Sequence, residues 1–202
     1  MAPEPFSGAV LAGGESRRMG RDKALVEAEP GRPLALVAAQ ALERAGAVEV
    51  VVVGGDREAF ESLGLRWLPD RFPGEGPLGG ILTALIAATD DLVVVLACDM
   101  PGVGPEVPLA LVHALAGAPT AKAAIAVVGD RDQPLTAAWR RSTAQAAMEA
   151  AFAAGERAPR RVLEPTTAVR VLGLPREQLE DVDSLEDLRR YAERHSPTNP
   201  KD

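Results

Sequence analysis

The chain has 202 residues, of which 47% are hydrophobic but only 3% aromatic, so its core must be built mainly from Ala, Val and Leu. The formal net charge of −7 excludes general affinity for nucleic acid, which needs clustered Lys and Arg. A single cysteine, Cys98, excludes an internal disulfide framework. Because there is no apolar run of 18 residues and no signal-peptide pattern, we expect a cytoplasmic protein without membrane contact.

Hydrophobic periodicity predicts strands and helices that alternate along the chain. In chain order, the predicted elements are a strand at 9–12, a helix at 33–45, a strand at 48–53, a helix at 59–63, a strand at 65–68, a helix at 78–88, a strand at 92–97, a helix at 107–115, a strand at 123–128, a helix at 144–154, a strand at 169–172 and a helix at 185–194. This order predicts an α/β protein, a three-layer α/β/α sandwich with a Rossmann-like, mostly parallel sheet. We expect one domain over residues 1–194 and a disordered tail over 195–202, where no apolar residue could anchor the chain.

A glycine-rich, basic loop follows the first predicted strand. It reads LAGGESRRMGRDK over residues 11–23, and its glycines allow backbone N–H groups to turn toward an anion. Four cations lie within seven residues of this loop: Arg17, Arg18, Arg21 and Lys23. The spacing matches neither a P-loop nor a dinucleotide-binding fingerprint. The loop therefore predicts a nucleoside triphosphate site of another kind, the alternative being a solvated basic turn.

Asp99 lies in the loop directly after the most hydrophobic predicted strand, 92–97. Ligands bind at the carboxyl ends of strands in an open parallel sheet, so this carboxylate is expected at the mouth of the cleft. There it could hold a magnesium ion that bridges phosphate oxygens, or it could merely cap the following turn. Its neighbour Cys98 is expected to be a small buried hydrophobe without a catalytic role.

Three other segments carry weaker signals. Residues 70–80 (DRFPGEGPLGG) combine turn residues with a helix start near Leu78, and helix N-termini can bind anions or read a base edge. Residues 131–135 (RDQPL) follow a predicted strand and could form the floor of an acceptor pocket. Asp181 and Asp183 could share a metal with Asp99, or they could be acids favoured at a helix N-terminus. Ser184 after them is a plausible N-cap, with Asp187 at the capping-box position.

Taken together, these segments resemble one enzyme family. The sequences LAGGESRRMGRDKAL (11–25), DRFPGEGPLGGI (70–81) and CDMP (98–101) resemble those of the molybdenum cofactor guanylyltransferases. The later segments RDQPLTAAWR (131–140) and DVDSLEDL (181–188) follow the same order as in that family, so the resemblance spans most of residues 8–190.

The resemblance implies a sheet of the nucleotide-diphospho-sugar transferase type and a specific reaction. Members of the family use GTP with Mg²⁺ and transfer GMP to molybdenum-bound molybdopterin, which gives a guanine dinucleotide cofactor and pyrophosphate. The Gly13-Gly14 pair is similar to that of the GTP-using enzymes, whereas the cytidylyl relatives usually have the sequence LAAG at this place. The resemblance therefore favours GTP. The late motif departs from the family's usual Asn-x-Asn, whose amides are thought to meet the pterin, because Asp181 and Asp183 stand there.

The resemblance also assigns roles to residues. The catalytic groups it implies are Lys23, Arg17, Arg18 and Asp99, with Asp99 as the metal ligand. The nucleotide-binding residues it implies are Leu11, Ala12, Gly13, Gly14, Lys23, Asp70, Gly76, Pro77, Leu78, Gly79 and Asp99. The acceptor-binding residues it implies are Arg131, Pro134, Asp181 and Asp183.

The expected chemistry is an in-line attack of the acceptor phosphate oxygen on the α-phosphorus of GTP, driven by positioning and electrostatics. Transient contact with molybdenum-insertion proteins and with target molybdoenzymes would follow from this role. Two other enzymes stay open as alternatives: a molybdopterin cytidylyltransferase and a nucleotidyltransferase for a sugar or polyol phosphate. A nucleotide sensor or cofactor chaperone without catalysis is the remaining alternative.

Overall fold

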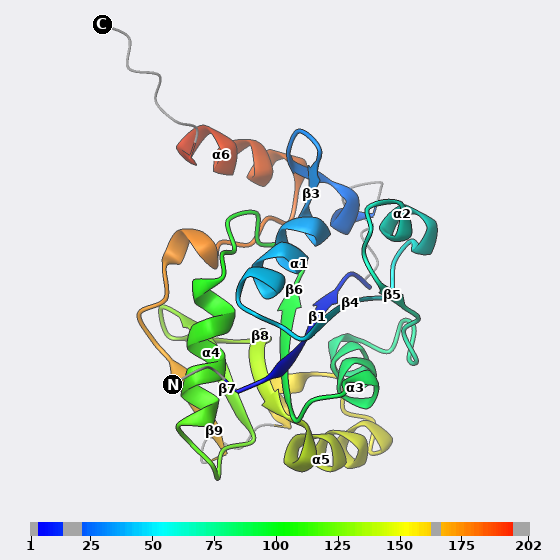
Figure 1. Ribbon diagram of the computed structural model, residues 1–202, viewed down its shortest axis with the longest axis vertical. Helices are drawn as coiled ribbons and strands as arrows, with labels where there is room; N and C mark the ends of the chain where they lie inside the picture. Colours follow the sequence, from blue (N-terminus) through cyan, green and yellow to red (C-terminus); the bar gives the residue numbers. More distant parts are fainter. Residues whose placement is uncertain (1–3, 14–21, 163–166, 196–202) are drawn as a thin grey trace, which may run out of the picture.

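The computed structural model describes residues 4–13, 22–162 and 167–195. A central seven-stranded sheet has the strand order β5-β4-β1-β6-β8-β7-β9, and a small hairpin, β2-β3, lies beside it (Figure 1). The sheet strands are β1 Phe6–Leu11, β4 Glu49–Val53, β5 Trp67–Leu68, β6 Leu92–Ala97, β7 Ala123–Val128, β8 Arg131–Arg140 and β9 Ala168–Val171. The hairpin consists of β2 Glu27–Glu29 and β3 Arg32–Pro33.

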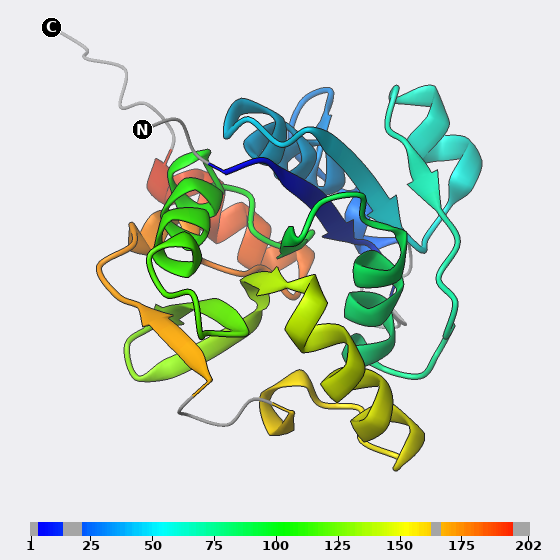
Figure 2. The ribbon, with the colours of Figure 1, turned by 60° about the horizontal axis from the view of Figure 1, so that its bottom comes forward.

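Helices cover both faces of the sheet, so the expected three-layer sandwich is confirmed. The helices are α1 Leu34–Arg44, α2 Arg57–Ser62, α3 Pro77–Ala87, α4 Glu106–Ala116, α5 Arg141–Ala153 and α6 Leu185–His195. Buried residues of α1 and α4 form one core cluster with one face of the strands. Buried residues of α3 and α5 form a second cluster on the other face, where Figure 2 shows these two helices side by side.

Strand β6 shows why the central strands read as continuous apolar runs. Val94 packs into the α1/α4 cluster, while its neighbours Val93 and Val95 pack into the α3/α5 cluster. Successive side chains of a strand point to opposite faces, so a strand covered on both faces must be apolar at every position. The predicted strands 92–97 and 123–128 have the observed bounds of β6 and β7, and the other predicted elements lie within a few residues of observed ones.

Strand β8 corrects the prediction for residues 131–135, which are not a loop after a strand. They open a ten-residue strand that runs antiparallel between β6 and β7. The pairing with β7 shifts register, since Ile125 pairs with Ala137 but Ala126 pairs with Gln133. Pro134 lies in this shift, where its missing N–H costs no ladder hydrogen bond.

The parallel strands bring three loops to one edge of the sheet. Leu11, the last residue of β1, is in register with Val53 on one side and with Ala97 on the other. The loops that begin after these residues therefore start at the same level. We call this the carboxyl edge.

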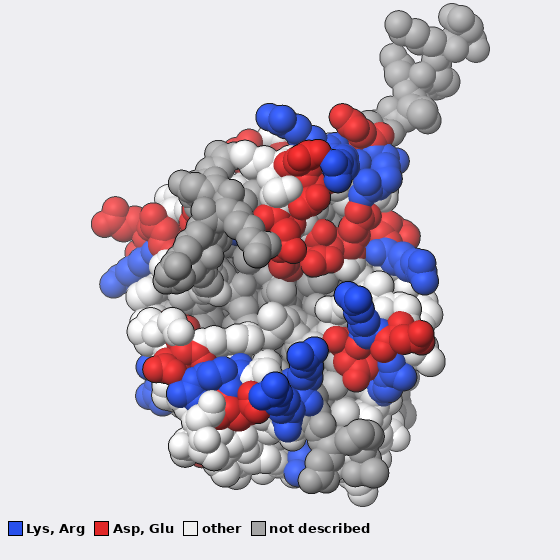
Figure 3. All heavy atoms as spheres, turned by 180° about the vertical axis from the view of Figure 1, so that it is seen from behind, with Lys and Arg blue, Asp and Glu red and all other residues white. Residues whose placement is uncertain are grey.

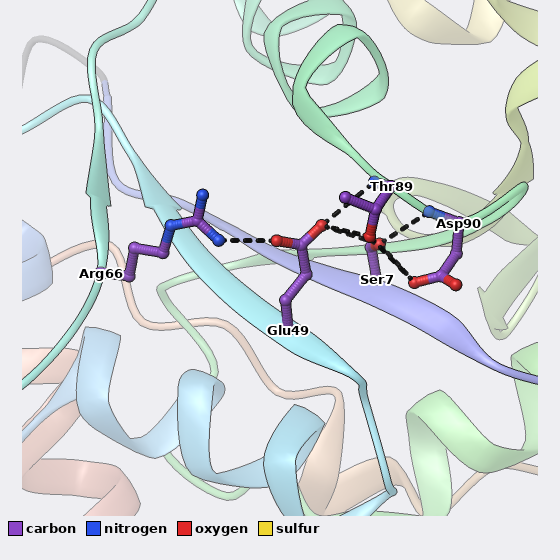
Figure 4. A network of polar contacts seen from close by, with 5 residues as sticks. All are labelled: Ser7, Glu49, Arg66, Thr89 and Asp90. Atoms are coloured by element: carbon purple, nitrogen blue, oxygen red, sulfur yellow. Dashed lines mark hydrogen bonds and ion pairs between the residues drawn. The ribbon is translucent and has the colours of Figure 1, made fainter.

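The opposite, amino edge is tied together by a polar network of Ser7, Glu49, Arg66, Thr89 and Asp90 (Figure 4). The Ser7 hydroxyl lies 2.8 Å from Asp90 Oδ2, and the Thr89 N–H and hydroxyl donate to Glu49 Oε1 at 3.1 and 2.9 Å. Arg66 Nη1 lies 2.7 Å from Glu49 Oε2. Burial raises the pKa of Glu49, but the hydrogen bonds from Thr89 and Ser7 and the charge of Arg66 outweigh it, so the pKa is lowered.

The last helix, α6, begins as predicted. The Ser184 hydroxyl accepts the Asp187 N–H at 3.1 Å and lies 2.7 Å from the Asp187 carboxylate, which is the expected capping box. The helix runs to His195, one residue into the predicted tail, and the rest of that tail, 196–202, lies outside the described residues. In the described part of the chain, no helix has the length and apolar character needed to cross a membrane.

Candidate active site

Three charged side chains from distant parts of the sequence meet at the carboxyl edge. The Lys23 ammonium lies 3.1 Å from Asp99 Oδ2 and 2.9 Å from Asp183 Oδ1. The Lys23 side chain is 17% exposed and that of Asp99 26%, whereas that of Asp183 is 65% exposed. The structure thus joins the predicted phosphate-binding lysine, the predicted metal ligand and one carboxylate of the late motif.

Short backbone contacts hold the three residues in place. Asp99 follows β6, and its carbonyl accepts the Val182 N–H at 2.9 Å. Val182 is buried in a small core cluster with Val26, Leu34 and Leu188, so the carboxylates on either side of it face outward. Lys23 opens a short 3-10 helix, Lys23–Leu25, which Asp22 caps by accepting the Ala24 N–H.

The two carboxylates determine the ionisation of Lys23. Burial lowers the pKa of the ammonium, but the charges of Asp99 and Asp183 and their hydrogen bonds outweigh it, so the pKa is raised above its usual value. Lys23 is therefore charged at neutral pH and can pair with a phosphate.

A cavity of about 160 Å³ opens beside Lys23, and we call it the nucleotide cavity. Most residues predicted to bind nucleotide line it: Leu11, Ala12, Gly13, Lys23, Asp70, Gly76, Pro77 and Asp99. Leu78 and Gly79 are not among its lining residues: the Leu78 side chain is fully buried, and the Gly79 carbonyl lies 3.0 Å from the Thr83 hydroxyl. Gly14, Arg17 and Arg18 lie outside the described residues, so their predicted roles stay predictions.

Glycines let two backbones approach closely in the wall of this cavity. A Cβ placed on Gly54 would lie 3.1 Å from the Gly13 Cα and 3.2 Å from its nitrogen. Gly54 also has a φ of 76°, which side-chain-bearing residues rarely adopt. The Ala12 N–H donates to the Val53 carbonyl at 3.0 Å. The loops after β1 and β4 are thereby locked together where the nucleotide is expected.

Asp70 enters the nucleotide cavity from the segment after β5. Its Oδ1 atom accepts the Phe72 N–H at 2.9 Å and lies 3.0 Å from the Thr83 hydroxyl. Helix α3 begins close by at Pro77, one residue before the predicted start near Leu78. Gly76 has a φ of 81°, and this conformation allows the sharp entry into the helix.

A second cavity, of about 390 Å³, adjoins the first, and we call it the acceptor cavity. The two cavities share Pro77, Ala97, Asp99 and Leu135. Of the residues predicted to bind an acceptor, Pro134 and Asp181 line the acceptor cavity. Asp183 instead contacts Lys23, and Arg131 is exposed at the start of β8 and is not among the lining residues.

Residues that the sequence did not single out also line the acceptor cavity. Arg160 brings a cation to its wall, beside the amide of Gln133, which belongs to the predicted floor at 131–135. The adjacent Arg160 and Arg161 form a basic pair in the sequence, a signal that could have found the first of them. Figure 3 shows the molecule hollowed on one face, with Asp and Glu gathered along the upper rim of the hollow and with Lys and Arg interspersed among acidic side chains below it.

The donor groups at this edge fit a magnesium ion that arrives with a nucleotide. In the described part of the chain, no three His, Cys, Asp or Glu side chains gather as a metal-binding group. Asp99 and Asp183, which share the Lys23 ammonium, supply two carboxylates. Mg²⁺ is commonly bound by one or two carboxylates together with substrate phosphates and water, so this set suits a nucleotide-bound ion.

Cys98 lines the nucleotide cavity but is chemically inert. Burial raises the pKa of its thiol to about 12, with a further contribution from the Asp99 charge. The thiolate needed for nucleophilic attack is therefore not formed at neutral pH. This agrees with its interpretation as a small buried hydrophobe.

A cavity larger than either of these lies elsewhere. It measures about 670 Å³ and lies between the β2-β3 hairpin, the loop after Asp99 and helix α6. None of the predicted substrate-binding residues lines it. The predicted substrate-binding residues therefore gather at the charged carboxyl edge rather than in this larger cavity.

Comparison with known proteins gives the family. Residues 8–171 match the family described as "MobA-like NTP transferase domain". The chain belongs to this family. A relative from Chloroflexus aggregans, named "Probable molybdenum cofactor guanylyltransferase", is 40% identical over 165 residues, which cover 75% of this chain and 73% of the relative.

Another relative, the molybdenum cofactor guanylyltransferase of Xanthomonas euvesicatoria, is 44% identical over 98 residues. That match covers 48% of each chain, so this chain aligns with only about half of that relative's length.

Solved structures confirm the fold. The molybdopterin-guanine dinucleotide biosynthesis protein A of Archaeoglobus fulgidus superposes with a TM-score of 0.73 at 28% identity, over 93% of this chain and 97% of that one. The 2-C-methyl-D-erythritol 4-phosphate cytidylyltransferase of Thermus thermophilus superposes with a TM-score of 0.67 at 18% identity, over 91% and 95%. The expected nucleotide-diphospho-sugar transferase fold is therefore confirmed.

Proposed function

We propose that the protein transfers GMP from GTP to the phosphate of molybdenum-bound molybdopterin, forming the guanine dinucleotide cofactor and releasing pyrophosphate. The observation that carries this proposal is the junction of the two cavities at Asp99 and Leu135, with Lys23 on the nucleotide side. A nucleotide in one cavity and an acceptor in the other would meet beside the charged groups.

The reaction needs little covalent chemistry from the protein. The acceptor phosphate oxygen attacks the α-phosphorus of GTP, a P–O bond forms, and the bond to the β-phosphate oxygen breaks to release pyrophosphate. Lys23 holds a phosphate oxygen and neutralises the negative charge that develops on it, while the two cavities align donor and acceptor. Arg17 and Arg18 are proposed to add charge from the same loop.

Asp99, with Asp183 beside it, would hold the Mg²⁺ that accompanies GTP. When bound, this ion draws electron density from the phosphate oxygens and orients them. The chain contributes by placing the two carboxylates next to Lys23, so that the metal ion and the ammonium would both reach the phosphates.

The choice of nucleotide and acceptor rests on relatives. The names of the Chloroflexus and Xanthomonas relatives support guanylyl transfer, and the name of the Archaeoglobus protein supports a molybdopterin acceptor. Within the acceptor cavity, Pro134 and Asp181 are proposed to contact the pterin. Delivery of the product to molybdoenzymes, and receipt of the acceptor from molybdenum-insertion proteins, follow as transient contacts in the cytoplasm.

A transfer screen tests the proposal. Purified protein is incubated with Mg²⁺, each of GTP, CTP, ATP and UTP, and either molybdenum-molybdopterin or a sugar or polyol phosphate, and products are identified by mass. We expect the guanine dinucleotide and pyrophosphate only with GTP and the molybdopterin acceptor. Transfer from CTP, or to another acceptor, would replace the proposed substrate. GTP binding without any pyrophosphate release would indicate a sensor.

A further inference from the structure

Thr83 is a buried polar residue that lies just behind the nucleotide cavity. It belongs to helix α3 and is only 1% exposed. Its hydroxyl oxygen accepts the Arg71 N–H at 3.1 Å. The same oxygen lies 3.0 Å from Asp70 Oδ1 and 3.0 Å from the Gly79 carbonyl oxygen.

The hydroxyl has one proton and two acceptors within reach. The Gly79 carbonyl is the ordinary acceptor for a threonine in a helix, four residues back along the chain. The Asp70 carboxylate is charged, and hydrogen bonds to charged acceptors are roughly twice as strong as neutral ones. Donation to Asp70 is therefore favoured, and the threonine joins the helix to the loop that carries this carboxylate.

These contacts use only one oxygen of Asp70. Oδ1 takes both the Phe72 N–H and the Thr83 hydroxyl. Within the described residues, no hydrogen bond to Oδ2 is found. A Cβ placed on Gly13 would lie 3.7 Å from Oδ2, so this oxygen faces the point where the loops after β1 and β4 touch.

The surroundings keep the carboxylate from turning. A Cβ placed on Gly79 would lie 2.8 Å from the Phe72 Cβ, so the first turn of α3 presses on the loop after Asp70. With the loop fixed and Oδ1 fully engaged, the orientation of the carboxylate is set before any ligand arrives. Preorganised acceptors of this kind lower the cost of ordering a site on binding.

We propose that Thr83 is a positioning residue that fixes Asp70 so that Oδ2 accepts a hydrogen bond from bound guanosine. This inference rests on the proposed function for the nucleotide. The guanosine donors that we assign to this contact are the two ribose hydroxyls and the 2-amino group of the base. Thr83 itself touches no substrate.

Equilibrium binding of nucleotides in the presence of Mg²⁺, measured by calorimetry on the full chain, tests the role. We expect Thr83→Val, which keeps the side-chain shape, to weaken GTP binding about tenfold, the usual cost of one misplaced hydrogen bond to a charged group. Thr83→Ser restores the hydroxyl and should bind GTP within about twofold of the wild-type protein. Thr143→Val is the matched control, since its exposed hydroxyl donates to the Arg140 carbonyl at the start of its own helix and, among the described residues, to no other group.

Nucleotide analogues identify the donor and separate positioning from general damage. GTP is compared with 2′-deoxy-GTP, 3′-deoxy-GTP and ITP, which lack one ribose hydroxyl or the 2-amino group. The analogue without the relevant donor should bind the wild-type and Thr83→Val proteins equally, while the other nucleotides lose affinity in the variant. Equal losses for all four nucleotides, or no loss for GTP, would overturn the proposal. Because nucleotide binding requires no transfer reaction, this test can be interpreted even if the transfer screen fails.

Discussion

The two edges of the sheet both gather carboxylates, but they hold them in opposite ways. At the amino edge, Glu49 and Asp90 lie around the Ser7 hydroxyl, and the Thr89 N–H and hydroxyl fix Glu49 as well (Figure 4). At the carboxyl edge, Asp99 and Asp183 lie around the Lys23 ammonium. One pair is held mainly by short neutral donors of the scaffold, and the other by a cation on a long, flexible stem.

This difference indicates which carboxylates serve the fold and which are available for a reaction. Short hydroxyl and backbone donors have few other positions, so the carboxylates they hold are committed to joining strands. A lysine ammonium is a point charge with several rotatable bonds, and it can move to a phosphate when a nucleotide arrives. The carboxylates it leaves are then available to a metal ion. A cluster of acids alone therefore does not mark a site; the kind of donors that hold most of its oxygens does.

Removing one carboxylate from each edge should have the largest and most unequal effects. We expect Asp99→Asn to lower kcat/KM for GMP transfer at least about a hundredfold, because the metal loses a charged ligand. Asp90→Asn should leave kcat/KM within about twofold and lower the free energy of unfolding by about 1 kcal/mol. Steady-state kinetics and urea unfolding on both variants check this. Near-normal transfer by Asp99→Asn at saturating Mg²⁺ would contradict the metal role.

Removing Lys23 should affect two ligands in opposite directions. In Lys23→Met we expect GTP affinity to fall about tenfold, because a charged hydrogen bond to phosphate is lost. Binding of Mn²⁺ without nucleotide should become tighter, because the ammonium no longer competes for Asp99 and Asp183. Calorimetry for GTP and electron paramagnetic resonance for free Mn²⁺ measure the two effects. Weaker Mn²⁺ binding in the variant would show that Lys23 organises the carboxylates rather than competing for them.

Gly54 tests the close approach of backbones at the carboxyl edge. A methyl group there meets the Gly13 backbone, so Gly54→Ala should raise KM for GTP severalfold and lower the unfolding free energy by about 1–3 kcal/mol. Gly46→Ala is the matched control, since Gly46 has a φ of 90° but nothing within 4 Å of a Cβ. It should lose stability with no change in KM. If both variants shift KM alike, crowding at Gly13 is not the cause.

Glu49 at the amino edge should make the free energy of unfolding depend on pH. The pKa of Glu49 is lowered in the folded protein from its usual 4.5. Its stabilising contribution is therefore complete above about pH 4.5 and is lost as the pH falls through the lower, folded value. We expect Glu49→Gln to be about 1 kcal/mol less stable at pH 7 and to lose less stability than wild type on acidification. Urea unfolding from about pH 3 to 7 measures both, and parallel curves would exclude this role.

Strong local patterns made most of the fold predictable. Strands β6 and β7 are apolar runs bounded by turn residues, so both their type and their bounds were predicted. Strand β8 was missed because it opens with Arg131, Asp132, Gln133 and Pro134, which read as a loop. Pairing with β6 and β7 makes this segment a strand, and such pairing overrides local preference.

The candidate site was predictable at positions where the type of residue itself indicates its chemistry. Lys23, Asp99 and Asp183 stood out as charges in loops after apolar strands or before a helix, and the structure brings them together. Thr83 and Gly54 gave no such signal. Their roles arise from contacts between elements far apart in the sequence, such as the 3.0 Å distance from Thr83 to Asp70. A single sequence does not reveal such contacts.

The position of β8 in the sheet limits the order in which the strands can pair while the chain is synthesised. Strand β6 is synthesised before β7 and β8, yet in the finished sheet it pairs with β8 on one side. Until residue 140 has emerged, that side of an entirely apolar strand has no partner, and an unpaired strand edge is a template for aggregation. The sheet cannot be completed one strand at a time from the N-terminus. Strand β7 is synthesised before β8 but reaches the rest of the sheet only through it, so this edge of β6 stays open until both strands have emerged.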